Sequence, residues 1–313
     1  MQRLVPALVI LNLLWIAQPA HADSGALPAP AHLAEAAARD ATPVADDGVS
    51  QPWRMPPIQV KGKPAPELRE EEAIGDYAQP RWTANRRFPN TRIYVVPKGK
   101  ATVEYWQRVN APLGDLVRSR GIQSYYELEL GLGHRVQLDL YLTTEQKGWK
   151  GDFGLKKEKL ELRYALADWG KLWGNPTLYL EWSRVHGDTD FCEGKILLGD
   201  QLAPSWHWGL NLAFETSLGG DWTHEFVLSG GISKTITDEG LSIGLEGKTG
   251  GIDKKGSRFK NFIEQAHLVG PSIAFYPVPA MHVLATVLVG VQGEAGHGYE
   301  SALESWLIGG WTF

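Results

Sequence analysis

Apolar and polar residues alternate one by one in segment after segment after residue 101, and this period of two constrains the fold more than any other feature. In YELELGLGHRVQLDLYL the even-numbered positions from Tyr126 to Leu132 are apolar, whereas Glu127 and Glu129 occupy odd positions. Successive side chains of a strand point to opposite faces, so the pattern predicts strands with one apolar and one polar face. The pair Gly133-His134 separates two such strands and predicts a hairpin.

Further segments with the same alternation are TVEYWQRV, KLELRYALAD, TLYLEWS, CEGKILLG, WGLNLAFE, HEFVLSGGIS, LSIGLEGK, GPSIAFY, HVLATVLVGV and SWLIGGWTF. Together with the hairpin they predict about twelve antiparallel strands. Short connections such as YPVPA alternate with long ones such as KTGGIDKKGSRFKNFIEQA, as expected when every second connection lies at the same end of a sheet. DWGKLWGNPT and GDQLAPSW are longer than expected for the end with short connections, and SLGGDW is shorter than expected for the other end. The pattern therefore does not fix the strand ends at these three places.

A soluble β-sandwich would show the same alternation, but with its apolar face turned inward. Aromatic residues near the expected strand ends favour a transmembrane barrel instead, because such barrels carry an aromatic girdle at each membrane interface. These residues are Trp169, Trp173, Trp206, Trp208, Trp222, Tyr276 and Trp311. A tilted strand of about 9 to 11 residues crosses the apolar core of a bilayer. Closure into a barrel would pair every strand edge, which lipid cannot do.

The N-terminal third differs in composition from the strand region. Residues 1–22 have the features of a secretory signal peptide, with Arg3, the apolar stretch LVPALVILNLLWIA and the small-residue site Ala20-His21-Ala22. Residues 23–100 contain an Ala/Pro-rich stretch, and we expect a mostly irregular periplasmic linker there. Its end carries six bases without an acid among them: Arg81, Arg86, Arg87, Arg92, Lys98 and Lys100. This basic stretch predicts a plug at the periplasmic mouth of the barrel, and the alternative is that these bases hold the chain near the anionic membrane surface or have no role.

The C-terminal segment SWLIGGWTF ends on Phe313, with Trp311 two residues before it. This ending, the signal peptide and the alternating strands resemble Gram-negative bacterial outer-membrane β-barrel proteins, which are porin-like, and no single family within that class is indicated. The resemblance covers residues 101–313. It implies a location in the cell outer membrane with both termini periplasmic, and the lipid bilayer and the barrel-assembly machinery as partners. In that class the closing strand is the assembly signal, which here would be Trp311 and Phe313.

The polar face of the strands supplies the candidate lumen residues. They are Glu104, Arg108, Glu127, Glu129, Asp139, Lys159, Glu161, Arg163, Glu181, Lys195, Glu215 and Glu246, and Lys157, Glu193, Glu225 and Lys248 share that face. Acids outnumber bases, so an open lumen would favour cations or neutral polar solutes. The alternative is that these charges pair across the lumen and fill it, because a barrel of about twelve strands has little spare width.

We therefore predict a passive channel for small polar solutes. The alternatives are a structural or adaptor barrel whose periplasmic segment binds a partner and, third, a lipid-modifying enzyme. His224 and His267 lie near strand ends on the outward side, but neither has a serine at a spacing typical of a nucleophile and its base. Hence no catalytic residue is predicted.

A metal site is also not predicted. Asp188, Asp190 and Glu193 could form a loop site for a hard cation, although a solvated loop explains them better. No cofactor is expected, and the net charge of -5 argues against nucleic acid as a partner.

Overall fold

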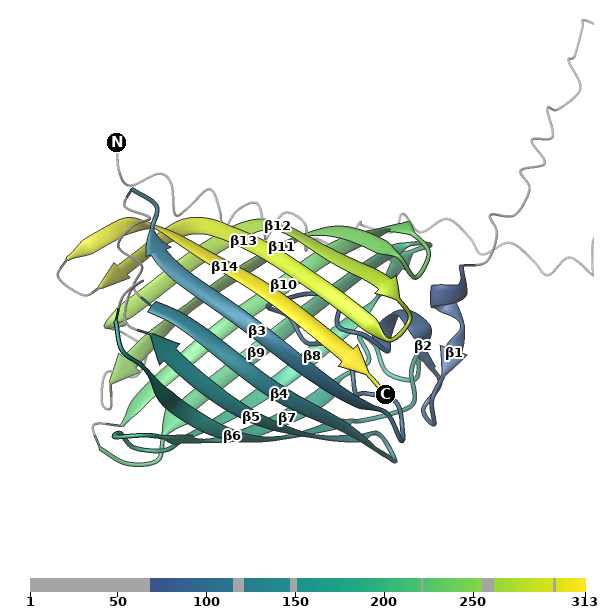
Figure 1. Cartoon of the computed structure of the whole chain (residues 1–313), viewed down its shortest axis with the longest axis horizontal. Coiled ribbons are helices and arrows are strands. Elements are labelled where there is room, and N and C mark those ends of the chain that lie inside the picture. Colours follow the sequence, from purple (N-terminus) through teal and green to yellow (C-terminus); the bar gives the residue numbers. More distant parts are fainter. Residues whose placement is uncertain (1–67, 115–120, 147–150, 221, 255–261, 295–296) are drawn as a thin grey trace, which may run out of the picture. The chain divides into compact units, whose positions relative to one another are not determined.

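The computed structural model describes residues 68–114, 121–146, 151–220, 222–254, 262–294 and 297–313. In this part of the chain, twelve strands form a closed antiparallel barrel in which each strand pairs with its neighbours in sequence and β14 pairs with β3 (Figure 1). The strands are β3 (Ala101–Pro112), β4 (Gly121–Gly133), β5 (Val136–Gln146), β6 (Phe153–Ala165), β7 (Thr177–Val185), β8 (Phe191–Ala203), β9 (Trp206–Ser217), β10 (Thr223–Thr237), β11 (Leu241–Lys254), β12 (Glu264–Val278), β13 (Met281–Glu294) and β14 (Gly298–Thr312). Every segment predicted from the alternation overlaps one of these strands, which confirms the predicted all-β barrel.

The alternation places polar residues inside the barrel and apolar residues outside. Along β7, buried and exposed positions alternate without interruption, and Glu181 is 2% exposed while its neighbour Leu180 is 56% exposed. Leu140 and Leu245 on other strands are similarly exposed. A soluble sandwich has the opposite arrangement, so the exposed apolar face is of the kind that a bilayer covers. The part of the chain that the structure describes contains no helix with the length and apolar character needed to cross a membrane.

The two ends of the barrel differ in their connections. At one end, here called the turn end, residues 204–205 join β8 to β9 and residues 279–280 join β12 to β13. The C-terminus lies at this end, as Figure 1 shows. GDQLAPSW therefore contains only a short turn, because β8 continues to Ala203, whereas residues 166–176 form a long connection. Apart from residues 166–176, the longer connections lie at the opposite end, here called the loop end, and several of them lie partly outside the described residues.

Residues 68–100, here called the lumen segment, precede β3 at the turn end. They contain two short 3-10 helices, η2 (Arg69–Glu71) and η3 (Arg81–Thr83), and two short strands, β1 (Ala73–Ile74) and β2 (Gln79–Pro80), which pair with each other. From residue 84 to residue 100 the backbone is irregular. Phe88 and Ile93 are fully buried, because this irregular part packs against the inner face of the barrel.

Glycines of the wall make room for the lumen segment. A Cβ atom at Gly209 on β9 would lie 2.5 Å from Cγ2 of Ile93, and one at Gly231 on β10 would lie 2.9 Å from the ring of Phe88. Carbon atoms in contact normally lie about 3.5 to 4 Å apart. A side chain larger than hydrogen at either position would therefore clash with the segment.

Candidate functional site in the lumen

The structure places the twelve predicted lumen residues on the inner face of the wall. Eight are buried: Glu104, Glu127, Glu129, Asp139, Glu161, Arg163, Glu181 and Glu246. Four are half-buried: Arg108, Lys159, Lys195 and Glu215. The buried group is concentrated around the lumen segment, whereas the half-buried group lies toward the loop end.

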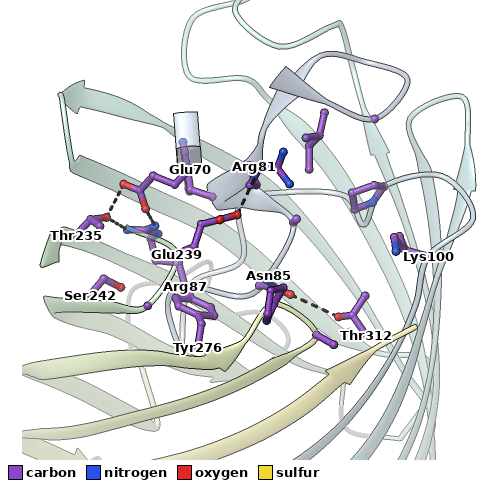
Figure 2. Close-up of a pocket in the computed structure, with 18 of the residues that line it drawn as sticks. Glu70, Arg81, Asn85, Arg87, Lys100, Thr235, Glu239, Ser242, Tyr276 and Thr312 are labelled. Atoms are coloured by element: carbon purple, nitrogen blue, oxygen red, sulfur yellow. Dashed lines mark hydrogen bonds and ion pairs between the residues drawn. The ribbon is translucent and has the colours of Figure 1, made fainter. Parts of the chain in front are cut away.

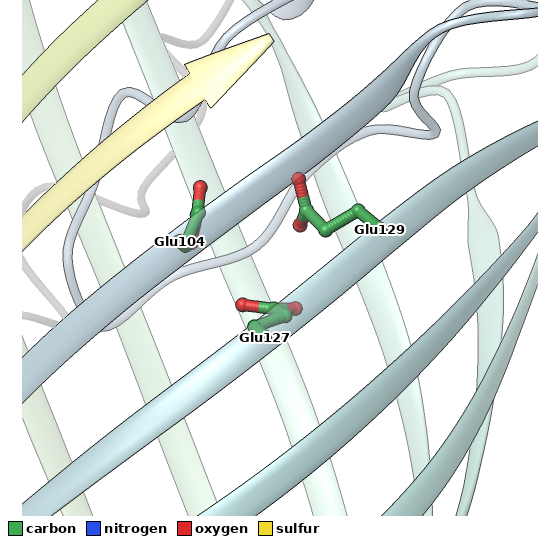
Figure 3. Close-up of side chains that lie close together, drawn as sticks. All are labelled: Glu104, Glu127 and Glu129. Carbon is green, nitrogen blue, oxygen red and sulfur yellow. The ribbon is translucent and has the colours of Figure 1, made fainter. Parts of the chain in front are cut away.

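Three glutamates of neighbouring strands form a close group of wall acids (Figure 3). Glu104 on β3 lies directly opposite Glu127 on β4, and Glu129 follows two residues later on the same face. All three are at most 3% exposed. Buried carboxylates this close repel one another and need cations nearby to stay ionised.

The lumen segment supplies these cations. Nη1 of Arg86 donates to Oε2 of Glu104 at 2.9 Å, and Nη2 of Arg92 donates to Oε1 of Glu127 at 2.7 Å. Nη1 of Arg92 also donates to Glu129. Burial by itself would lower the pKa of Arg92, but Glu127 and the other nearby acids raise it well above the usual value, so this guanidinium is charged.

An aromatic side chain completes the cation environment. The guanidinium carbon of Arg86 lies 4.0 Å from the ring centroid of Trp106, and that of Arg92 lies 5.0 Å from it. Nε1 of Trp106 donates to Glu104 at 2.6 Å. Both arginines therefore combine an ion pair with a cation–π contact inside the barrel.

Main-chain groups also connect the lumen segment to the wall. The backbone N–H of Arg92 donates to Oδ1 of Asn211 at 2.8 Å, and that of Val96 donates to Oε1 of Gln137 at 2.6 Å. The alternation also predicts that arginine is tolerated better at positions 137 and 211 than on the lipid face, and this stays a prediction. In the structure Gln137 and Asn211 are buried and bind the lumen segment.

Two tyrosines of the lumen segment lie in the same dry environment. Burial raises the pKa of Tyr77 above its ordinary value, and the nearby Val95 backbone and Arg163 only partly oppose this effect. Burial likewise raises the pKa of Tyr94. Both phenols are therefore neutral at physiological pH.

A second group of charges pairs within the wall. Arg163 on β6 is fully buried, and its Nη2 lies 2.9 Å from Oδ2 of Asp139, while its Nε donates to Glu161. Nη1 of the same residue donates to the carbonyl oxygen of Tyr94 at 3.3 Å. These wall pairs would stay paired if the lumen segment moved, because both partners belong to the barrel.

The lumen toward the loop end contains open cavities beside charged side chains. Arg108 and Lys248 both donate to Oε2 of Glu304 at 2.6 Å. Cavities of about 260 and 160 Å³ open beside these charges. Glu215 and Glu225 line the smaller cavity and form no ion pair with another described residue. The lumen thus has a packed half around the segment and, toward the loop end, a half that contains open cavities.

The other candidate residues do not converge on a site. Nδ1 of His224 lies 2.9 Å from the hydroxyl of Thr216, and Nδ1 of His267 lies 2.7 Å from that of Thr249. Asp188 accepts from the N–H of Thr189 in its loop. Glu193 lies on the inner face of β8, where its carboxylate lies 2.8 Å from Nζ of Lys195.

The predicted assembly signal lies at the turn end. Trp311 is 45% exposed and Phe313 is 67% exposed. The N–H of Phe313 donates to the carbonyl oxygen of Ala101 at 2.8 Å, so the last residue still pairs with the first residue of β3.

Sequence reasoning did not assign Arg86 and Arg92 to specific partners. The available signal was the run of bases without an intervening acid, together with the excess of acids on the strands. Charge complementarity could indicate that the two regions meet, but not which arginine meets which glutamate.

No family model matches the sequence, and a search of curated proteins found no match. The solved structures that match include outer-membrane β-barrel proteins, the class that the sequence resembles. The NanC porin has 10% identity and a TM-score of 0.49, with 67% of this chain and 98% of that chain covered. An outer membrane channel from Pseudomonas putida F1 has 9% identity and a TM-score of 0.48, with 70% and 97% covered. LpxR from Salmonella typhimurium has 9% identity and a TM-score of 0.41, with 67% and 99% covered. These values assign neither a family nor a function to this chain.

Proposed function

We propose that the protein is an outer-membrane channel for small polar solutes, and that its own lumen segment occludes the barrel at the turn end. The observation that carries this proposal is the burial of Arg86 and Arg92 inside the barrel, where they neutralise Glu104, Glu127 and Glu129 of the wall. In this proposal the turn end and both termini are periplasmic, and Trp311 and Phe313 form the signal for the assembly machinery.

The character of these contacts supports a removable plug. Each of these ion pairs joins a segment residue to a wall residue, so release lets water hydrate both partners. The cost of separating a buried pair is largest when one charge stays buried alone. After release the three glutamates would line a hydrated passage, which favours cations or neutral polar solutes over anions.

The test is the conductance of single proteins in planar bilayers. We compare the full chain with a variant that lacks residues 23–97 and with the full-length double variant Arg86→Glu, Arg92→Glu. The proposal expects larger currents from both variants, because deletion removes the plug and charge reversal makes the wall glutamates repel it. Small, equal currents from all three proteins, with folded barrels in each case, would contradict the channel and favour a structural barrel.

A further inference from the structure

A cavity of about 500 Å³ lies at the turn end between the lumen segment and the wall (Figure 2). Among its lining residues, Arg87 and Lys100 belong to the lumen segment, whereas Ser242 and Tyr276 belong to strands of the wall. The volume falls in the range of about 300 to 1,000 Å³ that is typical of small-molecule sites. The cavity is distinct from the acidic lumen described above.

The carboxylates of this cavity are already neutralised. Oε2 of Glu70 accepts from Nη2 of Arg87 at 2.8 Å, and Oε1 of Glu70 accepts from the hydroxyl of Thr235 at 2.6 Å. Glu239 lies 3.4 Å from Nε of Arg81 and 3.5 Å from Nη1 of Arg69. Among the described lining residues, each acid is therefore paired with at least one arginine.

Hydrogen-bond donors of the cavity remain without partners. Trp82 is 4% exposed and Arg87 is 3% exposed, yet Nε1 of the indole and Nε of the guanidinium bind no other described residue. Buried polar groups almost always have a partner. The lysines Lys98 and Lys100 also line the cavity, and neither forms an ion pair with a described residue. The unused groups are thus donors, and the charges of the two lysines are not balanced by a described residue.

We infer that this cavity binds a small organic anion, such as a carboxylic acid or a phosphate ester. Its oxygen atoms would accept from the indole and guanidinium N–H groups, while Lys98 and Lys100 balance its charge. A neutral ligand of the same size would leave the positive charges of both lysines without a counter-charge. A ligand in this cavity contacts both the lumen segment and the wall, so it stabilises the arrangement in which the two are together. That last consequence rests on the proposed channel, whereas the binding itself does not.

The experiment measures binding to the full chain in detergent by isothermal titration calorimetry. The probes are citrate, glucose 6-phosphate and, as the neutral match, glucose. We expect one or both anions to bind and glucose not to bind. Comparing citrate with glucose 6-phosphate shows whether the site prefers a carboxylate or a phosphate group. Calorimetry needs no open channel, so its result stands independently of the conductance measurement.

Two variants connect the binding to this cavity. Trp82→Phe keeps the ring but removes the unpartnered N–H, and a lost hydrogen bond to an anion weakens binding by about tenfold. Lys98→Gln with Lys100→Gln changes only exposed side chains and should weaken anion binding at least as much. The matched control is Lys171→Gln, an exposed lysine of the connection after β6 that does not line the cavity.

Equal binding of the anions by the wild type and the double lysine variant would overturn the inference, because it would indicate unspecific attraction to basic residues. Absence of binding by both anions would overturn it too. If Trp82→Phe fails to fold, as judged by circular dichroism, the double lysine variant still decides, because its side chains are exposed.

Discussion

Arg92 shows how one side chain can join two parts of this molecule. Its guanidinium binds Glu127 and Glu129 and lies over the ring of Trp106. Its backbone binds Asn211. These contacts reach three strands that are not all adjacent in the barrel wall. Because these contacts have defined partners on three strands, they fix the segment in one position, whereas charge attraction alone would not.

Replacing Arg92 by leucine should release the lumen segment. The change leaves Glu127 and Glu129 buried without their cation, and breaking a buried pair in this way costs about 3 to 5 kcal/mol. Release of the segment hydrates both acids and avoids that cost. Limited trypsin digestion is the measurement, because Arg86 and Arg87 are buried in the folded protein and become cleavable on release.

The matched control for this experiment is Arg69→Leu in the same segment. The side chain of Arg69 is 67% exposed, and exposed ion pairs contribute little. Cleavage after Arg86 should therefore stay slow in the control. Equal protection of Arg86 in Arg92→Leu and in the wild type would show that the ion pairs do not retain the segment.

Gly209 offers a test that changes no charge. Valine at this position would overlap with Ile93, since a Cβ atom alone would lie 2.5 Å from Cγ2 of that residue. Overpacking of this kind costs about 1 to 3 kcal/mol. We expect Gly209→Val to unseat the segment and to raise the bilayer current while the barrel stays folded.

Gly309→Val is the corresponding control on β14. No atom lies within 4 Å of a Cβ built at Gly309, so valine fits there without displacing anything. Its current should match that of the wild type. A current from Gly209→Val that also matches the wild type would mean that Ile93 adjusts without moving the segment.

At the scale of elements, the strands were the predictable part of this fold. A period of two needs only the order of apolar and polar residues, so each strand from β3 to β14 could be found before its partners were known. The strand ends were less certain. The glycine and proline of GDQLAPSW predict a long connection, but pairing with β9 extends β8 to Ala203.

The lumen segment was predictable only through its charge. From residue 84 to residue 100 it has no regular secondary structure, so no periodicity marks which residues face the wall. Its partners are acids of β3 and β4 and amides of β5 and β9, which lie far away in sequence. Only the folded barrel brings these groups around one segment, so the sequence does not indicate that Gln137 and Asn211 bind it.

Neighbouring residues of β10 test the assignment of the two faces. Leu228 lies on the outer face, whereas Val227 lines both cavities of the lumen. Leu228→Arg should destabilise the barrel in lipid vesicles by about 2 to 4 kcal/mol, because arginine is costly near the bilayer midplane. Val227→Arg should cost far less, because its charge stays in water. Urea unfolding in vesicles measures the free energy of unfolding of both variants. Equal losses would contradict the assignment of Leu228 to the outer face and Val227 to the inner face.

At the scale of the whole molecule, charge is divided between two parts that lie far apart in the sequence. The lumen segment carries the run of bases, and the inner wall around it carries an excess of buried acids. Neither part is complete without the other, because a dry lumen cannot hold Glu104, Glu127 and Glu129 as unpaired ions. With the segment in place, its bases compensate the charge of the buried acids. Without it, water has to fill the interior.

This division predicts the ion selectivity of the opened barrel. Once the segment is released, as in the Arg86→Glu, Arg92→Glu variant, the three glutamates should line a hydrated passage and attract cations. In a gradient of potassium chloride, the reversal potential should then move toward the potassium equilibrium potential. The selectivity should weaken at high salt, because screening shortens the reach of the wall charges to about 3 Å at 1 M.

The control adds Glu104→Gln, Glu127→Gln and Glu129→Gln to the opened variant. Glutamine keeps the size of the side chain and removes its charge, so the passage should stay open but lose most of its preference for potassium. If the reversal potential is unchanged by these substitutions, the selectivity comes from other lumen charges, such as Glu215 and Glu225 beside the smaller cavity. Those two acids line a cavity that also borders Asn90 of the segment, and they would then control permeation once the segment is released.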